Sequence, residues 1–386
     1  MKVLLVSPTV DTCYERVASI GLMNLYLIAK GVGCEVEYLD LTETSYSEGL
    51  KYIISKRYDV IGISCNFTNA APYCIQYSKD IKERHPDTLV ISGGNHATLV
   101  PEDLLLNGYD YIIYGEGESA FKIFLKRVLS RKSLEDLKGI YYLKDGNIIK
   151  NLPFEQIEDL DTLPLNDYSN FDLEPYFKKS GLRYISLETS RGCIHNCSFC
   201  STVRMWGHNY RQKSPQRVLK EFKIAQDLNL DFVFIEDDDV AINEKGFRDF
   251  CQLLIDEEIS VSWGCTIGSK SIKDFSTFDI MSKSGCIKVN ICVESANSRA
   301  LVGAFPAHHP SEKSRFRPSL KSRNPSSSSA SRAVNSEDSG ISESTNARCS
   351  STNCFRRPDI QLLAAVVSES DSSEPCFPNR PANISF

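Results

Sequence analysis

The sequence predicts an α/β protein in which strands alternate with helices in two successive regions. Short apolar, β-branched runs alternate with segments of helical spacing over residues 1–135, and the same alternation resumes at residue 183. A chain of 386 residues is long enough for two domains. From residue 301 to 386 the composition becomes Ser-rich without a sustained period, which predicts a disordered tail.

The first region, residues 1–135, predicts a doubly wound parallel sheet with helices on both faces, because five strand-like runs are each followed by a helical segment. The predicted strands are Lys2–Ser7, Glu35–Leu39, Asp59–Ser64, Thr88–Ser92 and Tyr109–Tyr114. The predicted helices are Ile20–Lys30, Leu50–Lys56, Tyr73–Arg84, Glu102–Leu106 and Ser119–Ser130. In open α/β sheets, ligands bind at the loops that follow the strands, so we expect a cofactor there.

Residues 136–182 predict a hairpin and a linker, since Asp145-Gly146 separates two apolar runs. Residues 183–300 then predict part of a barrel with four βα-type strands. The predicted strands are Tyr184–Glu188, Phe232–Glu236, Val261–Thr266 and Lys288–Val293, and the helices are Pro215–Asp227, Lys245–Asp256 and Phe278–Ser284. A barrel that stops here would keep an unpaired edge.

Composition excludes several classes of function. The formal net charge is −6, and the chain has no long block of like charges, so we expect no nucleic-acid or membrane partner. The apolar runs are far shorter than the roughly 18 residues that a membrane span needs. The start of the chain lacks a secretory cleavage pattern, which predicts a cytoplasmic protein.

Three cysteines are concentrated in one short segment that directly follows a predicted strand. Cys193, Cys197 and Cys200 place three thiolates within eight residues, a donor set that suits a soft metal centre with one open coordination position. A structural zinc site is the alternative, with His195 or His208 as the fourth ligand. The missing second Cys pair argues against zinc.

The spacing Cys193-x-x-x-Cys197-x-x-Cys200, with Phe199 before the last cysteine, resembles the radical S-adenosylmethionine (SAM) superfamily. The resemblance implies a partial (β/α)6 barrel and a [4Fe-4S] cluster held by the three cysteines, with SAM bound at the fourth iron. It also implies SAM contacts from Phe199, from Asp237 at an acidic strand end, and from Glu294 and Ser295.

The first region resembles the flavodoxin-like cobalamin-binding domain of cobalamin-dependent radical SAM enzymes. The resemblance lies in two loops, and it implies cobalamin contacts from Gly93, Gly94, His96, Gly115 and Glu116. The Asp-x-His-x-x-Gly pattern that supplies an axial histidine in other cobalamin proteins is absent. Cobalamin would therefore bind without a histidine ligand from this chain.

Together the resemblances imply an enzyme that cleaves SAM to a 5′-deoxyadenosyl radical and transfers a methyl group to an unactivated carbon of a small-molecule biosynthetic intermediate. The expected partners are that substrate and a reductant such as flavodoxin or ferredoxin.

An oxidative cyclase of the tetrapyrrole type is one alternative. The change of composition after Val302 suggests a truncated or frame-shifted chain, so a non-catalytic cobalamin-binding protein is another. Arg211 is expected to bind an anionic group of SAM or substrate.

Overall fold

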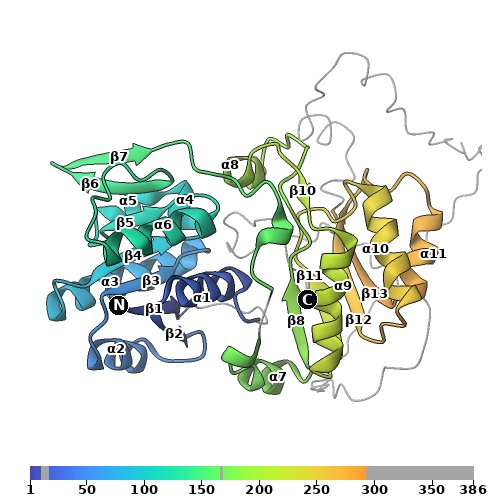
Figure 1. Cartoon of the computed structure of the whole chain (residues 1–386), viewed down its shortest axis with the longest axis horizontal. Coiled ribbons are helices and arrows are strands. Elements are labelled where there is room, and N and C mark those ends of the chain that lie inside the picture. Colours follow the sequence, from blue (N-terminus) through green and yellow to red (C-terminus); the bar gives the residue numbers. More distant parts are fainter. Residues whose placement is uncertain (10–16, 166–167, 293–386) are drawn as a thin grey trace, which may run out of the picture.

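The computed structural model describes residues 1–9, 17–165 and 168–292. A larger N-terminal lobe and a smaller second lobe lie side by side, with helix α1 (Ile20–Val32) facing the second lobe (Figure 1). The predicted tail, together with Glu294 and Ser295, lies outside the described residues. Within the described part of the chain, no helix is both long and apolar enough to cross a membrane.

The N-terminal lobe is built on a seven-stranded sheet in the order β2-β1-β3-β4-β5-β6-β7. Strands β1 to β5 are parallel, and their order 2-1-3-4-5 is that of flavodoxin-like folds, which confirms the predicted sheet. The strands are β1 (Lys2–Ser7), β2 (Glu35–Asp40), β3 (Val60–Ser64), β4 (Leu89–Gly93), β5 (Tyr111–Ile113), β6 (Ile140–Lys144) and β7 (Asn147–Asn151).

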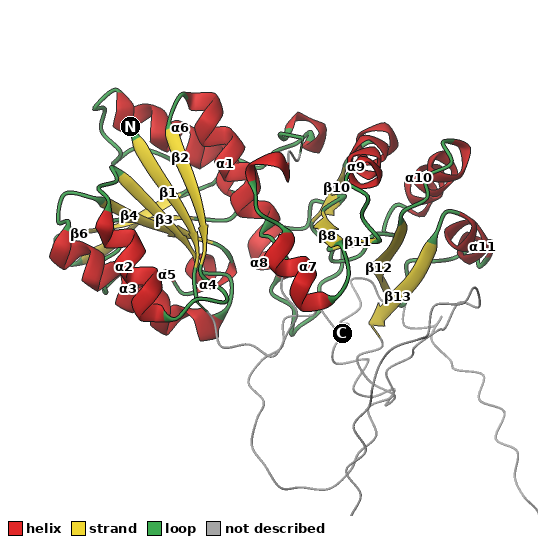
Figure 2. Cartoon of the chain, turned by 90° about the horizontal axis from the view of Figure 1, so that it is seen from below, coloured by secondary structure: helices red, strands yellow, loops and turns green. Residues whose placement is uncertain are grey.

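Helices cover both faces of this sheet. Helices α1 and α6 lie on one face, and α2 and α3 lie on the other (Figure 2). Besides α1, the helices of this lobe are α2 (Tyr46–Ser55), α3 (Ala71–Arg84), α4 (Asn95–Leu99), α5 (Pro101–Leu105) and α6 (Gly117–Leu129). The interior strand β1 has four consecutive buried residues, because apolar side chains pack on both of its faces.

The hairpin of β6 and β7 extends the sheet in the antiparallel sense, at the position that the sequence predicts. Asp145 and Gly146 both adopt positive φ angles, 50° and 76°, which is the conformation a two-residue type I′ turn requires. The linker after the hairpin contains α7 (Glu174–Ser180), a helix that the sequence analysis did not predict.

The second lobe contains a four-stranded parallel sheet in the order β13-β12-β11-β8. Its helices α9, α10 and α11 lie along one face (Figure 2). Alternate side chains such as Val233 and Trp263 face those helices and are fully buried. The elements are β8 (Tyr184–Leu187), β9 (Ser190–Arg191), α8 (Thr202–Trp206), β10 (Arg211–Gln212), α9 (Pro215–Asp227), β11 (Phe232–Ile235), α10 (Glu244–Asp256), β12 (Ser262–Gly268), α11 (Ser276–Lys283) and β13 (Cys286–Cys292).

The other face of this sheet carries a small aromatic cluster of Tyr184, Phe232 and Phe234. Val17, from the segment that precedes α1, packs against it. Helix α1 also contributes Met23 to the core of the second lobe, whereas its Leu22 belongs to the core of the first. The N-terminal domain therefore packs closely against the predicted barrel.

Candidate functional site

The cysteine loop starts where strand β8 ends, and β9 and β10 form a short antiparallel pair that fixes its base. Gly192 stands between Arg191 and the first cysteine with a φ of 86°. A Cβ at this position would lie 2.2 Å from the carbonyl oxygen of Asn209, so the loop passes too close to its neighbour for any other residue. The first cysteine is thus held at a fixed place beside the sheet.

Cys193, Cys197 and Cys200 are all partly exposed reduced thiols on this loop. The backbone N–H of Cys200 donates to the carbonyl of Cys197 at 3.1 Å, so the last two cysteines lie at the two ends of one tight turn. Burial raises the pKa of the Cys193 thiol to about 12, and the carboxylates of Asp239 and Asp238 act in the same direction. Iron coordination would reverse such a shift, because a metal-bound thiol is deprotonated.

The three cysteines do not form a compact site for a single ion in the described residues. Among the residues that the structure describes, no three Cys, His, Asp or Glu side chains converge tightly enough to hold one metal ion. The structure therefore does not bring His195 or His208 into a zinc site with the cysteines. Ligation of a [4Fe-4S] cluster by Cys193, Cys197 and Cys200 stays a prediction, in which each thiolate would bind a separate iron.

Asp237 binds the residues at the start of the cysteine loop through hydrogen bonds. Its side chain is buried at the end of β11, and it accepts hydrogen bonds from the Thr189 N–H at 2.7 Å, the Thr189 hydroxyl at 2.5 Å and the Ser190 hydroxyl at 2.7 Å. Burial raises the pKa of Asp237 to about 6, although these donors favour its charged form. The resemblance implies a SAM contact for Asp237, and the structure shows a carboxylate engaged with the loop that carries the cysteines.

The two following aspartates also bind elements around the loop. Asp238 accepts a hydrogen bond from the Thr202 hydroxyl at 2.9 Å, at the start of α8. Asp239 is buried and accepts from the Ala241 N–H at 3.2 Å and from the Ser271 hydroxyl. The acidic strand end therefore connects the cysteine loop, α8 and the segment after β12.

The predicted cobalamin loops lie at the carboxyl ends of β4 and β5. Gly94 precedes α4 with a φ of 101°, and a Cβ there would lie 2.3 Å from the side-chain oxygen of Asn66. Gly93 ends β4 beside it. His96 is buried, its Nδ1 lies 3.3 Å from the Thr68 hydroxyl, and its Nε2 lies 3.2 Å from the carboxylate of Asp103. Cofactor contacts from Gly93, Gly94 and His96 stay predictions.

The loop after β5 faces the second lobe. The Gly115 N–H donates to the Thr98 hydroxyl at 3.2 Å, and Phe154 packs so closely that a Cβ on Gly115 would lie 2.9 Å from its ring. The Glu116 side chain is fully buried and accepts from the Ile157 N–H at 3.1 Å. It also pairs with Arg191 at 3.2 Å and with Arg211.

Two arginines bind Glu116: the sequence predicted a functional role for Arg211, whereas only the structure points to Arg191. The sequence analysis missed Arg191, because nothing in its local pattern distinguishes it from other basic residues. For Arg211 it predicted an anionic group of SAM or substrate, and that contact stays a prediction, since the partners the structure shows are protein groups. The Arg211 guanidinium binds the Glu116 carboxylate and donates to the Ile157 carbonyl at 2.7 Å.

Phe199 is 52 % exposed on the cysteine loop. Its predicted contact with SAM stays a prediction, as do those of Glu294 and Ser295, which fall beyond the described range.

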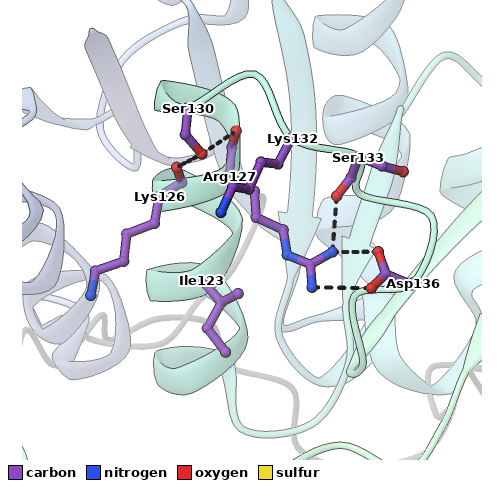
Figure 3. A pocket seen from close by; sticks show the side chains of 7 residues that line it. All are labelled: Ile123, Lys126, Arg127, Ser130, Lys132, Ser133 and Asp136. Carbon is purple, nitrogen blue, oxygen red and sulfur yellow. Dashed lines mark hydrogen bonds and ion pairs between the residues drawn. The ribbon is translucent and has the colours of Figure 1, made fainter.

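A shallow cavity of about 420 Å³ lies elsewhere, along the end of α6 and the turn after it (Figure 3). Arg127 lines it and is paired with Asp136. Helix α6 begins next to the loop after β5 and runs back along the sheet, so its last residues lie near the end of the sheet where the parallel strands begin. The cavity is therefore separate from the cysteine loop and from the predicted cofactor loops.

Two family models match this chain. The B12 binding domain matches residues 6–125, and the radical SAM superfamily matches residues 187–318. Together they cover more than half of the chain; the first falls within the N-terminal lobe, and the second begins at the end of β8 in the second lobe. The chain belongs to the radical SAM proteins that carry an N-terminal B12-binding domain.

Individual relatives agree with this class. An uncharacterized methyltransferase of Pyrococcus horikoshii is 27% identical over 313 residues, covering 78% of this chain and 67% of the relative. An anaerobic magnesium-protoporphyrin IX monomethyl ester cyclase of Rubrivivax gelatinosus is 27% identical over 314 residues, covering 77% of this chain and 56% of the relative. The chain thus spans between about half and two thirds of these relatives.

A solved structure shares the fold. The radical SAM methyltransferase TsrM of Kitasatospora setae, with tryptophan substrate and a SAM analogue bound, superposes with a TM-score of 0.70 at 19% identity. The match covers 78% of this chain and 61% of TsrM. It confirms the predicted α/β architecture of an N-terminal sheet followed by a radical SAM domain.

Proposed function

We propose that this chain carries out radical SAM chemistry with a [4Fe-4S] cluster and cobalamin, and that it transfers a methyl group to a carbon of a small molecule. The observation that carries the proposal is the loop of Cys193, Cys197 and Cys200 at the carboxyl end of β8, beside the B12-binding domain. The names of the methyltransferase relatives support it, as does a TsrM structure that contains cobalamin and a [4Fe-4S] cluster.

When bound, the cluster would supply one electron for the cleavage of SAM to a 5′-deoxyadenosyl radical, and cobalamin would supply the methyl group. The protein contributes the thiolates and their placement. Three cysteines leave one iron without a ligand from the loop, which is where SAM would bind. Asp237 accepts hydrogen bonds from Thr189 and Ser190, so the start of the loop would keep a defined conformation when the cluster binds.

Two further predictions concern the surroundings of the reaction. The chain would take its electron from a small reductant such as flavodoxin or ferredoxin, as the resemblance implies. We also expect the protein to act in the cytoplasm.

A second candidate function is oxidative cyclisation, because cyclases are also among the relatives. The two reactions leave different products of SAM. In methyl transfer, one SAM would donate its methyl group to cobalamin and leave as S-adenosylhomocysteine, while a second SAM would give 5′-deoxyadenosine in the radical step. Cyclisation would produce 5′-deoxyadenosine alone. Mass spectrometry of the nucleoside products therefore separates the two candidates.

The first experiment is anaerobic reconstitution of the full chain with iron and sulfide. We expect a [4Fe-4S] electron paramagnetic resonance (EPR) signal in the reduced protein that SAM perturbs, and we expect Cys197→Ala to abolish it. Cys34→Ala is the matched control, since Cys34 is a buried thiol of the N-terminal domain and its loss should leave the iron content unchanged.

A cluster that survives Cys197→Ala, or that ignores SAM, would contradict the proposal. A folded wild-type chain that takes up no iron would instead favour the non-catalytic alternative.

A further inference from the structure

Five charged side chains meet where the two lobes face each other, and we call them the boundary network. Glu116 and Glu118 come from the loop after β5 and the start of α6, while Glu188, Arg191 and Arg211 come from the second lobe. Four of them have side chains that are less than a tenth exposed, and Glu188 is 19% exposed.

Arg191 is the centre of the boundary network. Its guanidinium binds both oxygens of Glu118, at 2.6 and 3.2 Å, lies 3.2 Å from Glu116, and donates from Nε to Glu188 at 2.9 Å. The ring of Trp206 lies 5.4 Å from the same guanidinium. Arg211 supplies a second positive charge to Glu116.

Such a network resists relative movement of the two lobes. A buried charge that loses its partner is not rescued by water, so separating Arg191 from Glu116 and Glu118 is strongly unfavourable. The planar guanidinium also demands a particular direction of approach, because it binds Glu118 through two parallel N–H groups. The contacts therefore fix orientation as well as distance.

The boundary network also lies next to both proposed cofactor loops. Glu116 directly follows Gly115 of the predicted cobalamin loop, and Arg191 stands two residues before Cys193. Gly192 lies between Arg191 and Cys193 and is confined by the Asn209 carbonyl, so a displacement of Arg191 moves Cys193. A shift of either loop must therefore be transmitted to the other.

We propose that Glu116, Glu118 and Arg191 are positioning residues that couple the two cofactor sites, an inference that rests on the proposed function. Cobalamin in the N-terminal domain orders the loop after β5, and through Arg191 it stabilises the cysteine loop and slows loss of the cluster. Coupling between the binding free energies of two sites is reciprocal, so the cluster must also tighten cobalamin binding.

The chain offers a matched control within the second lobe. Glu221 is as buried as Glu116 and pairs with Lys213 at 2.9 Å and with Arg217 at 3.1 Å. All three of these side chains belong to the second lobe, so they do not connect it to the B12-binding domain. A variant at Glu221 removes a comparable buried charge without breaking the boundary network.

The experiment measures how fast the reconstituted full chain releases iron to a chelator, with and without hydroxocobalamin. For the wild type we expect hydroxocobalamin to slow release about tenfold, within the range typical of coupled sites. In Glu118→Gln the ratio should fall close to one, whereas in Glu221→Gln it should stay at the wild-type value. Arg191→Lys keeps the charge but loses the paired N–H groups, so its ratio should be intermediate.

A second readout is the affinity for hydroxocobalamin, measured by its absorbance with the cluster present and absent. Reciprocity holds for equilibrium affinities, so the dissociation constant for hydroxocobalamin should be lower with the cluster present, and this difference should disappear in Glu118→Gln but not in Glu221→Gln. The EPR signal of the reduced cluster shows whether each variant still assembles the cluster before its release is measured.

The outcomes are distinct. If hydroxocobalamin binds but does not slow iron release from the wild type, the coupling is wrong while the proposed function stands. If Glu118→Gln keeps the full ratio, or Glu221→Gln loses it equally, the boundary network does not carry the coupling. If the wild type binds no hydroxocobalamin at all, both the coupling and the cobalamin part of the proposed function fail.

Discussion

Two acidic loops lie at the carboxyl ends of parallel strands, and they use their carboxylates in opposite ways. The loop after β5 presents Glu116 and Glu118 to arginines from the other lobe. The loop after β11 presents Asp237 to hydroxyl and N–H groups of its own lobe. The first loop joins two domains through full charges, and the second holds the cysteine loop through neutral donors.

One acid at each of these two places has a shifted pKa, and the two shifts have opposite directions. Burial alone would raise the pKa of Glu118, but the charge and hydrogen bonds of Arg191 hold it below its ordinary value. Burial dominates at Asp237 and raises its pKa to about 6, because neutral donors compensate less of the lost hydration. Within the described part of the chain, Glu118 therefore has a full counter-charge where the domains meet, whereas the hydrogen bonds to Asp237 come from neutral donors.

The largest expected effect comes from removing the charge at the boundary. Arg191→Met keeps much of the side-chain volume but leaves Glu116 and Glu118 with fewer partners. Losing one partner of a buried ion pair costs about 3–5 kcal/mol, so the free energy of unfolding should fall by about that amount in urea denaturation. A loss below about 1 kcal/mol would mean that water reaches these carboxylates and that the boundary network is weak.

The next effect concerns how the free energy of unfolding depends on pH: the contributions of Asp237 and Glu118 should change in opposite directions. The folded-state pKa of Asp237 lies above its value of 3.8 in an unfolded chain. The folded state therefore binds the proton more tightly between pH 4 and 6, and this stabilisation is lost as the pH rises through about 6. The contribution is at most about 3 kcal/mol. Asp237→Asn should remove it, so the stability difference between wild type and variant should change across this range.

Glu118 should behave in the reverse sense. Its folded-state pKa is lowered from 4.5, so its contribution is present above pH 4.5 and is lost as the pH falls below that value. The stability difference between wild type and Glu118→Gln should therefore shrink in acid. Denaturation curves collected at several pH values test both signs, and equal slopes for the two variants would contradict the comparison.

The smallest effect is expected at an exposed contact between the linker and the N-terminal sheet. Lys179 of α7 pairs with Glu43 at 2.5 Å, and both side chains are about half exposed. Exposed pairs of this kind contribute about 0–1 kcal/mol, so Lys179→Ala should barely change the denaturation midpoint. A larger loss would show that the linker, and not only the boundary network, holds the two lobes together.

Much of the fold follows from local patterns in the sequence. The apolar run Lys2–Ser7 forms the strand it predicts, and Asp145-Gly146 forms the turn of a hairpin. The short helix α7 escaped prediction because residues 152–179, rich in Asp, Glu, Pro and Tyr, show no clear helical period. Strand β5 is shorter than predicted, since Tyr109 and Tyr114 are tyrosines with high strand propensity that lie just outside the ladder.

The sequence by itself determined the order of the elements and the cysteine spacing, because both depend on residues that are near neighbours along the chain. Only the tertiary structure decided the partners of the charged groups. Glu116 and Arg191 are 75 positions apart, and Asp237 is 48 positions from Thr189. Every acid in the sequence has many bases it could pair with, and only the packing of the two lobes brings particular ones together in a place from which water is excluded.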